Sequence, residues 1–243
     1  MIVSLKRIYI ALVAVDWETP RVLDMISGAL GSLRGPVVDV GCGYGRYLRP
    51  LKQRGIEAIG VDVNPGIVKA NRDAGLASMT PEEFLGSGSK AQVLLMSHVI
   101  EHFPPHELFP FMERWLDCLE EGGELLIATP LMGPQFYDDF DHVRPYHPEG
   151  LEMVFGERAA QVQYRSQHRL KIVEIAYRRS PWRVSFVGAV FRGGPPAWPY
   201  FLMNAVAALA FRLSGGLLGC KTGWIGRFRK LPPARPTAAP GLQ

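Results

Sequence analysis

Residues 37–48 have the sequence VVDVGCGYGRYL, in which residues typical of a buried strand lead directly into a glycine-rich turn. Three glycines, Gly41, Gly43 and Gly45, stand at alternate positions of this turn. The residues after the turn, beginning at Tyr47, have the apolar spacing of a helix. A strand, a glycine turn and a helix form a nucleotide-type site, because missing side chains let a ligand lie against the backbone.

The second predicted strand, IEAIGVD at residues 56–62, ends on Asp62, 21 residues after Gly41. At that distance a carboxylate can accept hydrogen bonds from both hydroxyls of a ribose. A dinucleotide site would need a small residue where this chain has Arg46. A phosphate-binding P-loop is excluded as well, because no Gly-Lys-Ser/Thr sequence follows. These features favour an adenosine-containing ligand other than a dinucleotide.

Strand and helix patterns alternate through the first 130 residues. Further strands are predicted at 76–79, 91–98 and 124–129, with helical patterns between them. This order predicts an α/β fold, a Rossmann-like, doubly wound and mostly parallel sheet with its ligand at the carboxyl ends of the strands. The sequences RLKIVEIAYRR (169–179) and WRVSFVGAVFR (182–192) predict an antiparallel hairpin at its edge.

The chain of 243 residues divides into four expected parts: an apolar leader at 1–19, the α/β domain at 20–192, an apolar and basic extension at 193–230, and a disordered tail at 231–243. Residues 175–243 carry ten of the 27 Lys and Arg and none of the 23 Asp and Glu. This excess of positive charge indicates an anionic partner. Three cysteines without metal or redox spacing favour a cytoplasmic location.

The extension contains AWPYFLMNAVAALAF, residues 197–211. Fifteen apolar residues are short for a membrane-spanning helix, which needs about 20. With tryptophans and cations around it, the segment is typical of an interfacial helix on the anionic inner face of the cell membrane. A lid over the active site or the interface of a homo-oligomer would also use such a helix. We expect no nucleic-acid partner, since the cations are spread among apolar residues.

Four segments together resemble the class I S-adenosylmethionine-dependent methyltransferases: VVDVGCGYGRYL, GVDVNP, MSHVIEHF and LEEGGELLIATP, within residues 37–130. The resemblance implies S-adenosylmethionine as methyl donor, with a role for nine residues. Gly41, Gly43, Gly45 and Asp62 would hold the donor, Asp39 would support the first motif, Met79 and Thr80 would lie near adenine, and Ser97 and His98 would face the reacting centre.

Residues 133–151, GPQFYDDFDHVRPYHPEGL, follow the fifth strand and are polar and aromatic. The acceptor should meet the methyl donor at this place. We expect His142 to be the general base, Asp141 or Asp139 to orient it, and Arg144 to hold an anionic group of the substrate. Alternatively, Asp141 and Arg144 pair to fold the loop. His147 would then only cap a helix that starts at Pro148.

No metal is expected from the sequence. HVIEH, residues 98–102, has the spacing of the zinc motif of inverted metalloproteases. That motif needs both histidines on one face of a helix, whereas His98 closes an apolar strand. We therefore expect Glu101 and His102 to shape the floor of the pocket.

The segment DHVRPYHPEGL also resembles methyltransferases of bacterial surface-polysaccharide and lipid-linked sugar pathways. This second resemblance implies O-methylation of a sugar hydroxyl on a glycan or lipid-linked glycan. Two alternatives remain: a small lipophilic acceptor of the quinone or polyketide type, and a non-catalytic binding module with the same fold.

Overall fold

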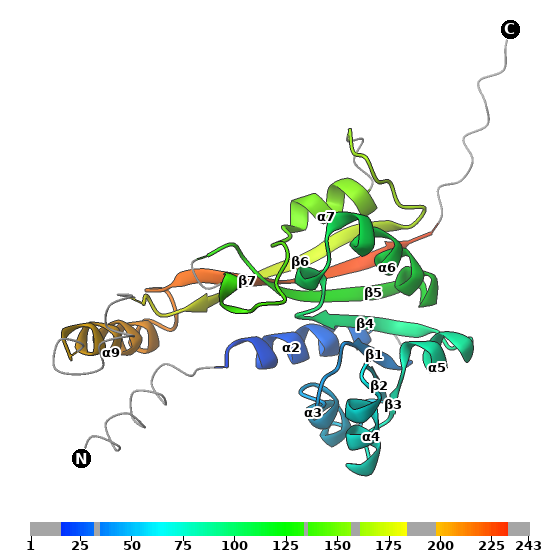
Figure 1. Cartoon of the computed structure of the whole chain (residues 1–243), viewed down its shortest axis with the longest axis horizontal. Helices are drawn as coiled ribbons and strands as arrows, with labels where there is room; N and C mark the ends of the chain where they lie inside the picture. Colours follow the sequence, from blue (N-terminus) through cyan, green and yellow to red (C-terminus); the bar gives the residue numbers. More distant parts are fainter. Residues whose placement is uncertain (1–15, 32–34, 134–135, 157–160, 184–197, 233–243) are drawn as a thin grey trace, which may run out of the picture. The chain divides into compact units, whose positions relative to one another are not determined.

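The structure is a computed structural model that describes residues 16–31, 35–133, 136–156, 161–183 and 198–232. The chain forms two compact units (Figure 1). The larger unit comprises residues 21–176 and 224–243, and the smaller comprises residues 1–20 and 177–223. Residues 1–15 of the predicted leader, residues 184–192 of the predicted hairpin and most of the predicted tail lie outside the described residues.

A seven-stranded sheet has the order β3-β2-β1-β4-β5-β7-β6. The strands are β1 (Val37–Val40), β2 (Ala58–Val61), β3 (Ser78–Met79), β4 (Ala91–Ser97), β5 (Leu119–Pro130), β6 (Arg169–Ser180) and β7 (Cys220–Leu231). The pairs β1–β2, β1–β4, β2–β3 and β4–β5 are parallel. The strand order reverses between β1 and β4, and this switch point is where open α/β sheets bind ligands.

The helices of the larger unit connect these strands. They are α2 (Glu18–Leu30), whose first residues belong to the smaller unit, α3 (Leu48–Gln53), α4 (Pro65–Asp73), α5 (Pro81–Gly86), α6 (Pro105–Cys118) and α7 (Pro148–Phe155), with two short 3-10 helices, η1 (Ile100–His102) and η2 (Phe136–Asp138). The predicted Rossmann-like, mostly parallel sheet is confirmed.

Alternate residues of β4 enter two different cores. Leu94 and Met96 pack with α5, α6 and α7, whereas Val93 and Leu95 pack with α2 and α3. Side chains of a strand alternate between the faces of the sheet, so a strand covered on both faces has to be apolar throughout. This explains why residues 91–96 form an almost continuous apolar run.

The seventh strand differs from the expectation. The sequence analysis assigned residues 193–230 to a separate extension, but β7 lies in the sheet between β5 and β6. Its Trp224 and Phe228 are buried in the main core. In CKTGWIGRFRKL, Trp224, Gly226 and Phe228 face one side of the sheet, as alternate residues of a strand do. The glycines and cations between the apolar residues make this strand pattern hard to recognise in the sequence.

Three cations of β7 are bound within the larger unit. Arg227 and Arg229 form ion pairs of 3.1 and 2.8 Å with Glu124, a carboxylate that is 1% exposed. Lys230 donates hydrogen bonds to two backbone carbonyl groups at the end of α6. These cations compensate a buried charge and otherwise unpaired carbonyl groups, so the fold itself gives a role to three of the ten cations that suggested an anionic partner.

The smaller unit contains α9 (Trp198–Leu213). The buried Phe211 of α9 packs edge-to-face on Trp17 at 5.7 Å between ring centroids. Glu18, which is also buried, forms an ion pair of 2.8 Å with Arg178. No helix in the described part of the chain is long and apolar enough to cross a membrane.

Candidate active site

The turn after β1 requires its three glycines. Gly41, Gly43 and Gly45 have φ angles of +75°, +50° and +78°, which L side chains rarely adopt. A Cβ atom at Gly41 would lie 2.6 Å from Val99 Cγ2, so this turn closely approaches the loop after β4. A Cβ atom at Gly43 would meet nothing within 4 Å, so the outer surface of the turn is open there.

Asp62 connects the end of β2 to this turn. Its Oδ2 accepts a hydrogen bond of 3.0 Å from the Gly43 amide, and its Oδ1 accepts one of 2.9 Å from the Asn64 amide. Each carboxylate oxygen retains a further lone pair. The structure thus joins Asp62 to the glycine turn, and the carboxylate retains the capacity to bind ribose hydroxyls.

Asn71, which the sequence analysis did not identify, supports the same turn from α4. Its Nδ2 donates a hydrogen bond of 2.8 Å to the Gly43 carbonyl oxygen, and the side chain is 1% exposed. A single asparagine 28 residues away carries no motif, so only the helical face common to Val68 and Asn71 could have indicated that it is buried.

Asp39 lies in the sheet beneath the turn and is 1% exposed. Among the described residues, its Oδ2 has no hydrogen-bond partner. Burial, and secondarily the negative charge of Asp62, raises the pKa of Asp39 to about 8, although Arg46 opposes the shift. Asp39 thus supplies an unpaired buried polar atom beneath the predicted donor site.

The raised pKa of Asp39 predicts a pH-dependent stability. Between pH 4 and 8 the native state holds one proton more than the unfolded state, so stability should fall as the pH rises through this range, by at most about 1.4 kcal/mol per pH unit. Asp39→Asn should flatten this dependence in urea unfolding from pH 5 to 8.5. The exposed Asp24→Asn is the matched control, and equal slopes in wild type and Asp39→Asn would refute the prediction.

The end of β4 brings Ser97 and His98 to the switch point. Ser97 Oγ lies 3.1 Å from the Tyr47 hydroxyl, which connects this strand to the segment after the glycine turn. His98 has a φ angle of +57°, a conformation that is costly for a residue other than glycine and that often marks a functional position. Both residues lie at the carboxyl end of β4, and their place at the reacting centre stays a prediction.

Met79 and Thr80 follow β3 and have structural contacts. The Met79 carbonyl oxygen accepts a hydrogen bond of 3.2 Å from the Asp62 amide. Thr80 is the N-cap of α5, and it exchanges hydrogen bonds with Glu83 in a capping box. The position of Met79 beside Asp62 suits its expected place near adenine, while the Thr80 side chain is occupied by the cap.

The loop after β5 places His142 beside η1. His142 Nδ1 lies 2.6 Å from the Phe136 carbonyl oxygen. A carbonyl can only accept, so Nδ1 carries the proton and Nε2 has the free lone pair. His142 Nε2 is 3.7 Å from Asp139 Oδ2. Asp139, rather than Asp141, is thus the carboxylate near this ring, and the Phe136 backbone fixes its tautomer.

Asp141 contributes through its backbone instead. Its carbonyl oxygen lies 3.1 Å from His102 Nδ1, so this ring also carries its proton on Nδ1. The ring centroids of His102 and His142 are 5.0 Å apart. The structure thus brings together two imidazoles from segments 40 residues apart, which spacing along the chain could not show.

Glu101 anchors the acceptor loop and is fully buried. Its carbonyl oxygen accepts hydrogen bonds from the amides of Val143 and Arg144 at 2.9 and 3.1 Å. Its Oε2 accepts one of 2.9 Å from the Thr129 hydroxyl. A buried carboxylate is costly unless hydrogen bonds and opposite charge compensate it, so its presence here indicates more than packing.

The Arg144 side chain is exposed, and its guanidinium lies 5.6 Å from the centre of the Tyr146 ring. It is therefore accessible to a substrate. His147 occupies the N-cap position of α7, but its side chain makes no capping hydrogen bond.

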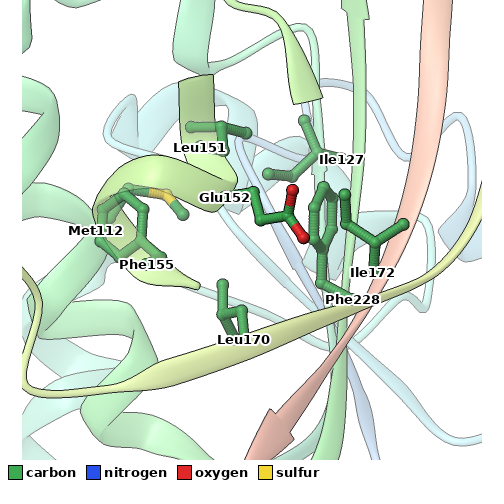
Figure 2. A pocket seen from close by; sticks show the side chains of 8 residues that line it. All are labelled: Met112, Ile127, Leu151, Glu152, Phe155, Leu170, Ile172 and Phe228. Atoms are coloured by element: carbon green, nitrogen blue, oxygen red, sulfur yellow. The ribbon is translucent and has the colours of Figure 1, made fainter. Parts of the chain in front are cut away.

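A separate apolar pocket lies between α6, α7 and strands β5, β6 and β7 (Figure 2). Its lining includes Met112, Phe155 and Phe228, and Glu152 is the one charged residue among the eight that line it. None of the predicted site residues lines it, and it has no room for a water molecule. We assign this pocket to core packing.

Comparison with known proteins identifies related domains. The family model described as "Methyltransferase domain" matches residues 19–170. A ubiquinone biosynthesis O-methyltransferase from Azorhizobium caulinodans is 32% identical over 101 residues, which are 38% of this chain and 39% of that protein. The matched segment therefore spans about two fifths of this relative's length.

Solved structures show the same fold. A SAM-dependent methyltransferase from Archaeoglobus fulgidus has 20% identity and a TM-score of 0.54, with 85% of this chain and 90% of that chain covered. Magnesium protoporphyrin IX methyltransferase from Synechocystis PCC 6803, solved with bound SAM, has 13% identity and a TM-score of 0.51, with 87% and 78% covered.

Proposed function

We propose that this chain, which belongs to the methyltransferase domain family, transfers the methyl group of S-adenosylmethionine to a hydroxyl oxygen. Its class I methyltransferase fold supports this proposal. The acceptor is a small lipophilic molecule of the quinone type. The observation that carries this proposal is the Asp62 carboxylate bound to the Gly43 amide at the switch point of the sheet.

The reaction is a displacement at a methyl carbon. The acceptor oxygen forms a bond to this carbon as the carbon–sulfur bond breaks, its electron pair goes to sulfur, and the hydroxyl proton leaves. S-adenosylmethionine supplies the electrophilic methyl group. The protein has to align the acceptor and receive the proton. The Nε2 lone pair of His142, in a ring held by the Phe136 carbonyl, is suited to this second task.

The acceptor class follows from the relatives and from the loop after β5. The curated relatives of the matched segment are named ubiquinone biosynthesis O-methyltransferases. That name favours a quinone-type hydroxyl over the sugar hydroxyl that the shorter sequence resemblance implied. A lipid-linked sugar would bring a phosphate, for which Arg144 is the accessible partner in this loop.

Two acceptors and one variant test the acceptor class. A dihydroxyphenol with an isoprenoid tail and an undecaprenyl diphosphate sugar are each offered with methyl-labelled S-adenosylmethionine. We expect label on the phenol oxygen, and Arg144→Ala should change this rate less than twofold. Transfer only to the sugar, with a large loss in Arg144→Ala, would replace the quinone-type acceptor with a glycan.

The smaller unit supports a location at an anionic membrane surface. Its helix α9 has exposed apolar residues at helical spacing: Leu202, Val206, Leu209 and Leu213. Trp182 and Arg183 of the same unit are exposed as well, and residues 177–223 contain no acidic residue. An exposed apolar stripe in a segment that has several cations and no acidic residue suits an interfacial helix, which would bring the enzyme to a lipophilic acceptor.

Sedimentation with lipid vesicles checks this location. We expect more protein to bind phosphatidylglycerol vesicles than phosphatidylcholine vesicles, and we expect Val206→Glu with Leu213→Glu to lower the bound fraction at least about fivefold. Met153→Glu removes an exposed apolar residue from the larger unit and should have no effect. Equal binding by all three proteins would exclude α9 as the membrane contact.

A further inference from the structure

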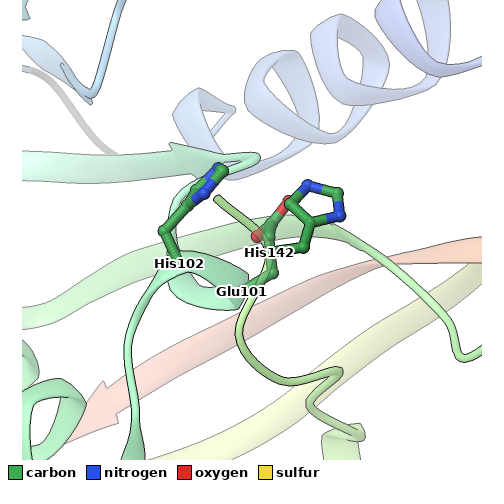
Figure 3. Close-up of side chains that lie close together, drawn as sticks. All are labelled: Glu101, His102 and His142. Atoms are coloured by element: carbon green, nitrogen blue, oxygen red, sulfur yellow. The ribbon is translucent and has the colours of Figure 1, made fainter. Parts of the chain in front are cut away.

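Three potential metal ligands meet beside the loop after β4. Glu101 and His102 come from η1, and His142 comes from the loop after β5 (Figure 3). One ligand atom from each side chain lies within 4.8 Å of the other two. A cation held at about 2.1 Å from each ligand needs separations of about 4 Å or less, so a small contraction would complete a site.

The hydrogen bonds of both imidazoles are those of metal-ligating histidines. His102 and His142 each direct Nδ1 at a backbone carbonyl, that of Asp141 and that of Phe136. Such a bond fixes the tautomer and ring orientation and leaves Nε2 as an unprotonated ligand atom. Core packing alone does not require two neighbouring histidines with the same hydrogen-bond arrangement, so the pair indicates a ligand site.

The third ligand is a carboxylate with an uncompensated oxygen. Glu101 is fully buried, and its Oε1 has no hydrogen-bond partner in the described part of the chain, although His98 Nδ1 lies 3.2 Å away. Its other oxygen is satisfied by Thr129. A negative charge in the low-dielectric interior is costly, and a cation bound at Oε1 would compensate it.

We propose that Glu101, His102 and His142 bind one divalent transition-metal ion, such as Zn²⁺ or Mn²⁺. Two imidazoles and one carboxylate favour these ions over Mg²⁺ and Ca²⁺, which prefer oxygen ligands. Three protein ligands leave coordination positions open, as in catalytic rather than structural sites. The expectation of no metal rested on spacing along the chain, which does not show that His142 lies beside Glu101 and His102.

The role of the ion rests on the proposed function. An acceptor hydroxyl that occupies an open coordination position has a lowered pKa, so it loses its proton to solvent and reacts as the oxyanion. The His142 lone pair is then occupied by the ion. In this scheme the ion activates the acceptor, and His142 holds the ion rather than taking up the proton.

Metal binding is tested on the full-length protein independently of methyl transfer. Protein treated with a chelator is titrated with Co²⁺, whose visible absorption reports the ligands, and with Zn²⁺ in competition. We expect one ion per chain, and at least about tenfold weaker binding in His142→Ala and in His102→Ala. His106→Ala and His147→Ala remove exposed histidines outside the site and should bind as wild type.

Titration of S-adenosylmethionine into the same samples separates the two proposals. Donor binding without any metal binding, or with equal metal affinity in wild type and both ligand variants, would overturn the metal site alone. Full methyl-transfer activity after chelation would overturn its role in activating the acceptor. A third ligand variant is Glu101→Gln, in which the substituted residue is buried. His102 and His142 are only partly buried, so their variants test the site even if Glu101→Gln fails to fold.

Discussion

His142→Ala should lower the turnover of methyl transfer about 100-fold or more while the affinity for S-adenosylmethionine changes less than about threefold. The ring lies in the acceptor loop, where Phe136 fixes its tautomer and Asp139 is its nearest carboxylate. The acceptor oxygen needs this ring whether Nε2 takes up its proton or holds an ion that lowers the pKa of the hydroxyl. The substitution removes neither the glycine turn nor Asp62, so donor binding should survive.

The matched control for this prediction is His147→Ala. His147 lies five residues further along the same loop, it is exposed, and its side chain makes no capping hydrogen bond. Its substitution should leave turnover within twofold of wild type. Single-turnover kinetics with labelled donor measure both variants. Equal turnover in His142→Ala and wild type would remove His142 from the chemistry.

Asp62→Ala should weaken the binding of S-adenosylmethionine about 100-fold, because two charge-assisted hydrogen bonds to the ribose are lost. The same change removes the acceptor of the Gly43 and Asn64 amide hydrogen bonds, so the glycine turn also loses its support. Calorimetry with donor and with its demethylated product should show the same loss, since both contain the ribose.

Asp73→Asn is the corresponding control. Asp73 is the last residue of α4, its side chain is exposed, and it forms an ion pair with Lys69 at the surface, an interaction of little energetic value. Wild-type affinity in Asp73→Asn and a large loss in Asp62→Ala would assign the effect to the carboxylate at the turn. Unchanged affinity for S-adenosylmethionine in Asp62→Ala would show that Asp62 does not take part in donor binding.

The parallel half of the fold was predictable because its signals are local. An apolar run, three alternate glycines and an acidic residue at the end of the next strand occur within 26 residues of sequence. The place of β7 was not predictable from such signals. Its strand pattern is interrupted by glycines and cations, and its partner Glu124 lies about 100 residues earlier in the chain. A basic segment therefore looked like a surface for an anionic partner.

In the candidate site, too, some features were predictable from the sequence and others were not. Spacing along the chain indicated Asp62 as a ligand-binding residue, and the family resemblance indicated Ser97. The structure places Asp62 against the glycine turn and Ser97 beside Tyr47. It did not show that backbone carbonyls, rather than Asp141, would orient His142, since any residue can offer a carbonyl. It also did not bring His142 to Glu101, because this contact depends on how the loop after β5 folds back onto η1.

Calorimetric titration of S-adenosylmethionine into the wild-type protein, with and without anionic vesicles, tests the assignment as a methyltransferase most directly. We predict one donor molecule bound per chain in at least one of these conditions, with the demethylated product competing for the same site. Absence of binding in both conditions, with the protein folded, would contradict it. The glycine turn, Asp39 and Asp62 would then belong to a scaffold that has the fold without the reaction.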